Sequence, residues 1–332
     1  MNSFRLARLS ALLLVPALAI VGVSGCSSPE SASGSATGDW SYTDDTGATV
    51  TLDAQPDRIA SFSDYAVGLL SNDIEPIAIF GRFDVESDER FAEYDISDTA
   101  IVGNSYGEID LEALAEAAPD LIVTGIYPTD REGTLDLEGP LYGVADAEQQ
   151  KQLEKIAPVV AIEVGGKGKD VIESMSKLAQ ELGTSAETIA AGKKEYEAAA
   201  ADLALAAEET GLEVTQMYAD AAGVYVVKPL DEPETELYRD LGVNFTNANP
   251  DGYYYWDIYS WENAAQMMTG DVLLVNVEGF QEDDLLAQAT FASHPALQAG
   301  QIHTWNGAAL DYASQAAHMK ELANILREST KL

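Results

Sequence analysis

Tyrosine and arginine side chains stand at the ends of several predicted strands in the first half of the chain. Ligands of open parallel sheets bind in the crevice outside the carboxyl ends of the strands. That edge is therefore a candidate ligand-binding wall with aromatic and cationic groups. Its candidate residues are Tyr65, Arg82, Tyr106, Tyr127 and Arg131. At each position the alternative is a solvated arginine or a tyrosine packed at the edge of a loop.

A second candidate group lies in the other half of the chain, where four aromatic residues run consecutively from 253 to 256 behind a Pro/Gly turn. Four such rings cannot all face inward. One interpretation is an edge strand with alternate rings buried. The other is an aromatic platform, with Tyr255 and Trp256 facing a bulky, partly apolar ligand. Lys228 and Arg239 are nearby cationic candidates.

Several kinds of chemistry lack a sequence signal. The chain has no HExxH motif. Residues 103–107 (Gly-Asn-Ser-Tyr-Gly) match the letters G-x-S-x-G, so a hydrolase elbow stays open there, and acidic residues are so common that a catalytic carboxylate pair stays open too. His294, His303 and His318 all lie in the last forty residues, so they cannot form a zinc site shared by two lobes. A tyrosinate site for bare ferric iron at 253–255 is conceivable. The Gly/Lys run at 165–169 lacks the spacing of a P-loop. We expect no resident cofactor.

The charge balance is strongly acidic. The 332 residues include 56 Asp or Glu against 18 Lys or Arg, a net charge of −38. Nucleic acid is therefore not an expected partner, because phosphate binding needs clustered cations. The acids either serve solubility, spread over solvated faces, or form an acidic mouth that attracts cationic ligands.

The first 38 residues have the pattern of an export signal and a tether. Arg5 and Arg8 precede an apolar stretch at 9–23, and Cys26 is the single cysteine. Residues 23–26 (Val-Ser-Gly-Cys) resemble the lipobox of bacterial lipoproteins, in which the cysteine is acylated; a plain secretory signal is the alternative. We expect a signal peptide at 1–25, lipidation at Cys26 and a flexible tether at 26–38. The folded part would then lie on the outer face of the cytoplasmic membrane, held only by its lipid.

The elements that position the first candidate wall alternate between strand and helix. A small hairpin is expected at 40–52. Strands are expected at 59–62, 74–80 (broken by Pro76), 100–102, 120–124 and 159–162, and helices at 64–70, 110–118 and 148–156. This alternation predicts an open parallel sheet covered by helices.

The remaining elements predict a connector and a second lobe. A helix at 165–184 would join a first lobe at 39–164 to a second lobe at 185–332. In the second lobe, strands are expected at 213–218, 223–227 and 272–275, and helices at 186–210, 233–241, 260–268 and 312–326. The predicted fold class is α/β, with two Rossmann-like lobes of parallel-rich sheets joined by a single long helix.

One pattern occurs in both lobes and suggests their relationship. A short helix with a glutamate in its first turn, then a breaker and a buried strand, occurs at Glu112 and again at Glu262. The interval is far too long for a solenoid repeat. Two similar α/β lobes of this kind usually hold something between them.

Residues 39–326 resemble the helix-linked (class III) siderophore-, haem- and cobalamin-binding proteins of ABC importers. The resemblance lies in the order and spacing of several short sequence marks. The marks are Arg58-Ile59-Ala60-Ser61 after a proline, Glu112 followed by Pro119-Asp120-Leu121-Ile122, Lys155-Ile156-Ala157-Pro158-Val159, and Ser260-Trp261-Glu262 ahead of Asp271-Val272-Leu273. The resemblance implies a monomer of two lobes bridged by one long helix, with the ligand in the cleft. It also implies that Glu112 and Glu262 dock onto arginines of the permease, which works with its ATPase. The alternative for these glutamates is simple helix capping.

Within that family a ferric siderophore is the expected ligand. The negative field favours a neutral or cationic hydroxamate complex over a trianionic catecholate complex. Haem or cobalamin is the alternative within the same fold, and a secreted hydrolase is the alternative from another class. A binding protein rather than an enzyme is the prediction.

Overall fold

The computed structural model describes residues 40–248, 251–307 and 309–332. The expected signal peptide at 1–25, Cys26 and the tether at 26–38 lie outside these residues. Among the described helices, none combines the length and the apolar character that crossing a membrane requires.

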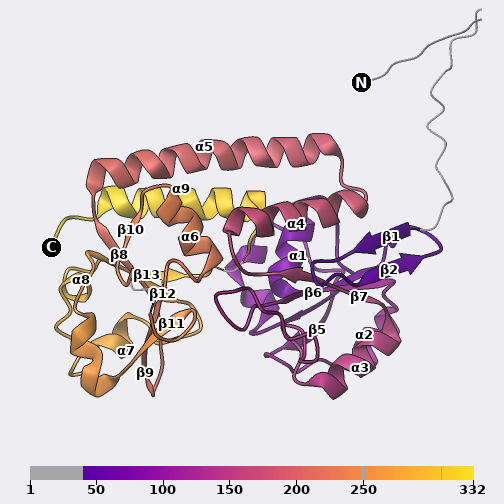
Figure 1. Ribbon diagram of the computed structural model, residues 1–332, viewed down its shortest axis with the longest axis horizontal. Helices are drawn as coiled ribbons and strands as arrows, with labels where there is room; N and C mark the ends of the chain where they lie inside the picture. Colours follow the sequence, from indigo (N-terminus) through magenta and orange to yellow (C-terminus); the bar gives the residue numbers. More distant parts are fainter. Residues whose placement is uncertain (1–39, 249–250, 308) are drawn as a thin grey trace, which may run out of the picture. The chain divides into compact units, whose positions relative to one another are not determined.

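The first sheet consists of five parallel strands in the order β5-β4-β3-β6-β7 (Figure 1). Its strands are β3 (Ile59–Phe62), β4 (Ala78–Gly81), β5 (Ala100–Asn104), β6 (Leu121–Ile126) and β7 (Val159–Glu163). Its helices are α1 (Ser63–Leu70), α2 (Leu111–Ala117) and α3 (Ala147–Ile156), with short 3₁₀ turns η1 (Val85–Ser87) and η2 (Glu89–Phe91). The predicted parallel sheet is confirmed.

Two local details follow from backbone chemistry. The hairpin β1 (Trp40–Thr43) and β2 (Thr49–Leu52) forms a separate antiparallel sheet, as expected. The expected strand at 74–80 was wrong at its start, because β4 begins only at Ala78, two residues beyond Pro76. A proline has no N–H for a ladder hydrogen bond, so the strand can form only after it.

Two helices follow the first sheet. The range 165–184, where we expected the joining helix, contains α4 (Gly168–Glu181), which packs against β7 and against α6 of the second lobe. The longer α5 (Ala186–Thr210) begins at the Ser185 cap, ends at Gly211 in the left-handed conformation, and leads into the second sheet (Figure 1). At about 1.5 Å per residue, its 25 residues span about 37 Å. The domain boundaries at 164/165 and 184/185 stay predictions.

The second sheet is mixed, with the strand order β11-β9-β8-β12-β13 and β10 beside β8. Its strands are β8 (Glu213–Ala219), β9 (Gly223–Val227), β10 (Asn244–Phe245), β11 (Trp256–Ser260), β12 (Val272–Asn276) and β13 (Ile302–Trp305). β8, β10, β12 and β13 are parallel, whereas β9 is antiparallel to both β8 and β11. The fold class, two α/β lobes with parallel-rich sheets and a long connecting helix, is confirmed.

The second lobe has helices of very different length. They are α6 (Pro233–Asp240), the 3₁₀ helix η3 (Trp261–Met267), α7 (Glu282–Leu286), α8 (Pro295–Gln298) and α9 (Tyr312–Glu328). The last helix, α9, packs along α5 and also contacts α1 of the first lobe (Figure 1). The C-terminal segment therefore contacts both lobes. Its buried face includes Met319, Leu322 and Leu326.

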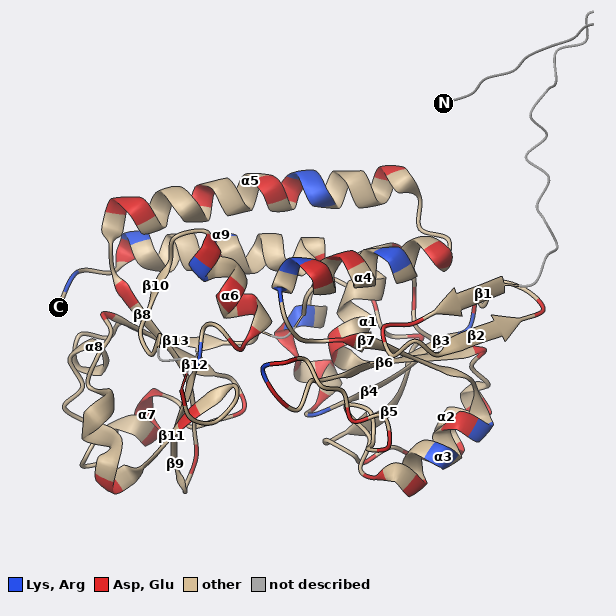
Figure 2. Cartoon of the chain, viewed as in Figure 1, with Lys and Arg blue, Asp and Glu red and all other residues tan. Residues whose placement is uncertain are grey.

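Acidic residues are distributed over both lobes. Figure 2 shows Asp and Glu on α2, α3, α5, α6 and α7, with few basic residues between them. This distribution fits the solubility interpretation of the net charge. Glu232 and Glu234 differ from these acids, because they are buried and line a cavity between the lobes.

Candidate functional site

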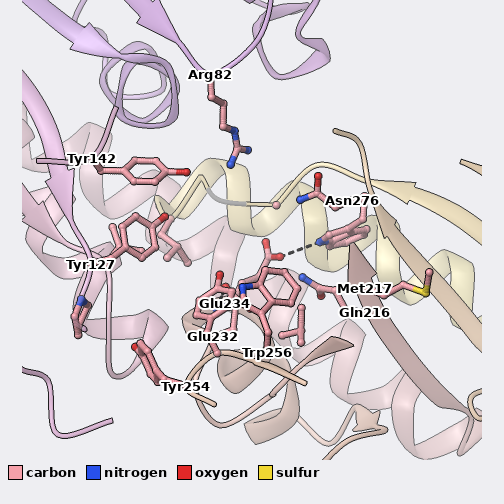
Figure 3. A pocket seen from close by; sticks show the side chains of 17 residues that line it. Arg82, Tyr127, Tyr142, Gln216, Met217, Glu232, Glu234, Tyr254, Trp256 and Asn276 are labelled. Carbon is pink, nitrogen blue, oxygen red and sulfur yellow. Dashed lines mark hydrogen bonds between the residues drawn. The ribbon is translucent and has the colours of Figure 1, made fainter. Parts of the chain in front are cut away.

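A cavity of about 380 Å³ lies between elements of the first and second lobes. Figure 3 shows its lining side chains. They are Arg82, Tyr127, Pro128, Tyr142, Val164, Gln216, Met217, Val227, Glu232, Glu234, Tyr254, Tyr255, Trp256, Asn276, Trp305, Gly307 and Leu310. This size, with an aromatic wall and a few polar groups, is typical of a small-molecule site.

The first-lobe wall is built at the carboxyl ends of parallel strands. Arg82 directly follows β4, and Tyr127 directly follows β6. The Tyr142 N–H donates to the Gly125 carbonyl of β6 at 2.8 Å, which holds that ring beside the strand end. The rings of Tyr127 and Tyr142 have centroids 4.6 Å apart. The strand-end rule therefore explains why these side chains meet.

Arg82 forms ion pairs with two carboxylates. Its Nε lies 2.8 Å from Glu278 Oε1 of the second lobe, and its Nη2 lies 3.8 Å from Asp64 Oδ1. The Nε is not aligned for a hydrogen bond, so the contact with Glu278 is an ion pair by distance alone. Burial works to lower the pKa of Arg82, but Asp64, Tyr142 and Glu278 raise it above its usual value. The guanidinium of Arg82 therefore stays protonated, and the two neighbouring carboxylates largely balance its charge.

The second-lobe wall contains the aromatic run. Trp256 opens the edge strand β11, and its ring lies 4.9 Å from that of Tyr255. Tyr255 has φ of +72°, a left-handed conformation that is unfavourable for a residue with a bulky side chain. Its backbone is held by two hydrogen bonds: its N–H donates to Asp231 Oδ2 at 3.1 Å, and its carbonyl accepts from the Lys228 N–H at 2.9 Å. Strain maintained in this way is often found at binding sites.

Two buried carboxylates complete the second-lobe wall. Glu232 caps α6, accepting from the Glu234 N–H at 3.1 Å and the Thr235 N–H at 2.6 Å. Glu234 Oε2 accepts from Trp305 Nε1 at 2.9 Å, the dashed contact in Figure 3. Glu234 Oε1 lies 2.9 Å from His318 Nδ1, and it also accepts from Tyr238 and Gln315.

The two carboxylates differ in their acidity. Burial and then the neighbouring Glu234 raise the pKa of Glu232 to about 7. Burial also acts to raise the pKa of Glu234, but the hydrogen bond and charge of His318 outweigh it and lower that pKa. The pKa of His318 is raised, because Glu234 overcomes the opposing effect of burial. At neutral pH the cavity therefore has a permanent anion at Glu234, paired to His318, and a titrating one at Glu232.

The structure brings four of the predicted ligand-binding residues to this cavity: Arg82, Tyr127, Tyr255 and Trp256. Arg131 lies beside it and crosses between lobes. Its guanidinium pairs with Asp231 at 2.7 Å and donates to the carbonyls of Gly252 and Tyr253. Asp231 in turn accepts from the Tyr255 N–H, so Arg131 supports the aromatic wall indirectly.

The other four predicted residues do not line the cavity. Tyr65 is buried with its ring against Gly125, where a side chain on residue 125 would collide with the hydroxyl. Tyr106 is half exposed and packs on Tyr142. Lys228 is fully buried, pairs with Asp257 at 3.1 Å and donates to the Asp251 carbonyl. Arg239 is exposed and pairs with its neighbour Asp240.

Sequence reasoning did not identify several lining residues. They are Tyr142, Gln216, Glu232, Glu234, Tyr254, Asn276 and Trp305. The strand-end rule, applied to the second lobe, would have selected Asn276 and Trp305, the last residues of β12 and β13. Glu232 had a weaker signal, because an acceptor before Pro233 is typical of a helix start. Tyr142 lies in a long loop between β6 and α3, and no sequence pattern distinguishes it.

The described ranges contain no cluster of three His, Cys, Asp or Glu side chains suited to a metal ion. The predicted docking residues lie away from the cavity. Glu112 and Glu262 are both exposed, in the first turns of α2 and η3. The side chain that caps α2 is Asp110, which accepts from the N–H groups of Glu112 and Ala113. The side chain of Glu112 is therefore not the cap of α2.

Comparison with known proteins defines the class. A model of the periplasmic binding protein family matches residues 36–309, so the chain belongs to that family. The structure of DesE, a ferric-siderophore receptor protein from Streptomyces coelicolor, has 26% sequence identity and a TM-score of 0.75, covering 88% of this chain and 99% of that one. A search of curated proteins gave no significant match.

Two further solved structures share the fold at lower identity. The siderophore periplasmic binding protein from the fuscachelin gene cluster of Thermobifida fusca is 24% identical, with a TM-score of 0.60 over 82% of this chain and 97% of that one. FeuA from Bacillus subtilis, complexed with ferri-bacillibactin, is 15% identical, with a TM-score of 0.65 over 87% and 98%. The predicted membership of the helix-linked binding proteins that serve ABC importers is confirmed.

Proposed function

We propose that this protein is the extracytoplasmic receptor of an ABC importer, that it binds a ferric siderophore in the inter-lobe cavity, and that it delivers the chelate to the permease. The observation that carries the proposal is the aromatic, Arg82-containing cavity, in a chain 26% identical over nearly its full length to a ferric-siderophore receptor. The site binds and releases its cargo without chemical change, so the protein is not an enzyme.

The charges around the cavity support a neutral or cationic chelate of the hydroxamate type. Among the described lining residues Arg82 is the one Lys or Arg, and Glu278 and Asp64 already partner it. The nearby Arg131 and Lys228 have carboxylate partners of their own. A trianionic catecholate complex needs cations to replace its hydration, and these cations are already paired.

A titration panel tests this proposal. Trp256 and Trp305 line the cavity, so a bound iron chelate should quench their fluorescence. The panel comprises a ferric trihydroxamate, a ferric tricatecholate, haem and cobalamin. We expect sub-micromolar quenching by the trihydroxamate and a weaker response to the other three. Preferred binding of haem or cobalamin would replace the ligand assignment, and hydrolytic turnover without any binding would overturn the receptor role.

Delivery to the permease is the second part of the proposal. Exposed glutamates in corresponding helices of the two lobes suit arginine partners, which form bidentate pairs with carboxylates. The variant Glu112→Lys/Glu262→Lys should abolish uptake of the chelate and leave its affinity unchanged. The matched control is Glu116→Lys/Glu282→Lys, two exposed acids on α2 and α7 with the same total charge change. Normal uptake by the first variant would disprove the docking role.

Anchoring is the third part. An acylated Cys26 would hold the monomeric receptor on the outer face of the cytoplasmic membrane. Mass spectrometry of the mature N-terminus should find a diacylglyceryl cysteine, and Cys26→Ser should release the protein into the medium or periplasm. An unmodified cysteine, or cleavage at another residue, would contradict the anchor.

A further inference from the structure

The polar lining of the second-lobe wall includes several buried hydrogen-bond acceptors. Glu232 and Glu234 are carboxylates, and Gln216 has a side-chain oxygen that is buried without a partner in the described part of the chain. The indole N–H of Trp305 is already donated to Glu234. A bound molecule that satisfies this wall must therefore bring donors.

Of the two carboxylates, Glu232 has more remaining capacity. Each of its oxygens accepts one backbone N–H, and a carboxylate oxygen can accept a second hydrogen bond. Glu234 Oε1 is saturated by Tyr238, Gln315 and His318, and its charge is balanced by that histidine. Within the described part of the chain, the Glu232 carboxylate forms no ion pair, and the N-terminus of α6 is its main stabilisation.

Aromatic rings accompany this carboxylate. Tyr254, Tyr255 and Trp256 line the same cavity, and the charge of Glu232 contributes, after burial, to the raised pKa of Tyr255. A carboxylate and aromatic rings that line one cavity can together recognise an ammonium group, through a charge-assisted hydrogen bond and cation–π attraction.

We propose that Glu232, assisted by Gln216, determines the ligand's charge, by binding a protonated amine carried by the ferric chelate. The inference rests on the proposed siderophore function and adds to it the ligand class: a chelate with a free primary amine and a net positive charge. Arg82, on the opposite lobe, is left to face the oxygen-rich iron centre.

A matched pair of ligands tests the proposal. The probes are the ferric complex of a linear trihydroxamate that ends in a primary amine, and the same complex with that amine acetylated. At about pH 8 the amine is still protonated and Glu232 is ionised. The full chain should bind the amine form about tenfold more tightly than the acetylated form. Glu232→Gln should abolish most of this preference, and the control Glu236→Gln, on the same helix but outside the lining, should retain it.

Each outcome decides the matter. Equal affinities in the unmodified protein overturn the inference and leave the siderophore function standing, whereas no binding of either complex overturns both. A full preference in Glu232→Gln removes the role of Glu232. Should that variant fail to fold, Glu232→Asp retains a helix cap and its charge but withdraws the carboxylate by one methylene. Its preference should fall about threefold, and an unchanged preference would contradict the assignment.

Discussion

The two lobes contribute side chains of different chemistry to the same cavity. The first lobe, with an all-parallel sheet, supplies a guanidinium and two phenols: Arg82, Tyr127 and Tyr142. The second lobe, with a mixed sheet, supplies two carboxylates and two indoles from Glu232, Glu234, Trp256 and Trp305. A ligand that bridges the lobes therefore meets a paired guanidinium with phenols at one end and carboxylates with indoles at the other.

The same asymmetry joins the lobes around the cavity. Arg131 and Arg82 of the first lobe pair with Asp231 and Glu278 of the second, respectively. Because arginines on one side meet acids on the other, most of the positive charge is consumed by the protein itself. We infer that the selectivity of this site comes from the charges that stay available to the ligand, and we assign Glu232 the foremost part.

The largest effect should come from removing the buried anion of the second lobe. Glu234→Ala leaves the Trp305 indole without its acceptor and His318 without its counter-ion, and removes one of two acceptors from both Gln315 and Tyr238. We therefore expect a loss of about 3 kcal/mol in the free energy of unfolding. Urea denaturation measures it. Glu236→Ala, on the same helix but only half-buried, should cost less than about 1 kcal/mol. Equal losses would mean that the Glu234 network is not special.

The next effect concerns the aromatic end of that lobe. Trp256→Ala should weaken binding of the ferric trihydroxamate about 30-fold, because the ring forms part of the cavity wall. Intrinsic fluorescence from Trp305 or calorimetry gives the affinity. The control Tyr253→Ala removes an adjacent ring that is 73% exposed and should change affinity less than about twofold. A larger effect of Tyr253 would place the ligand outside the cavity.

A pH series separates Glu232 from its neighbours. Its folded pKa of about 7 lies above the ordinary value of 4.5, so the folded protein retains this proton over a window in which the unfolded chain has lost it. Raising the pH from about 4.5 to 7 therefore reduces stability, by about 2 kcal/mol for this group. His318, whose pKa is raised, acts in the same direction, since its contribution is lost as the pH rises through the folded pKa.

The measurement is urea denaturation of Glu232→Gln and of the unmodified protein across that pH range. The variant should gain stability relative to the unmodified protein as the pH rises, and the difference should level off above about pH 8. A constant difference in stability would show that Glu232 has an ordinary pKa. It would also weaken the contrast between Glu232 and Glu234.

The smallest effect should come from the seam between the lobes. Arg131→Ala removes the pair with Asp231 and the contacts to two carbonyls, so the lobes should open more readily and the chelate should dissociate about threefold faster. Stopped-flow displacement gives the rate. Arg239→Ala, which removes an exposed pair with an adjacent residue, is the control and should leave the rate unchanged.

Much of the fold could be predicted, because the sequence patterns of helices and strands lie within short stretches of the chain. The helix predicted at 186–210 and the strand predicted at 223–227 have the observed bounds. The strand predicted at 74–80 with a break at Pro76 forms only beyond that proline, at Ala78–Gly81. The strand-end rule found Arg82 and Tyr127, but the long loop before α3 hid Tyr142.

By itself, the sequence determined the α/β class, the family and the aromatic run at 253–256, because apolar periodicity, breakers and residue order are local properties of the chain. Only the tertiary structure decided which charges stay available at the cavity. Arg131 and Asp231 are 100 residues apart, and Arg82 and Glu278 come from different lobes. Such pairings depend on how the two lobes meet. The same contacts that neutralise the arginines leave Glu232 as the buried acceptor facing the ligand.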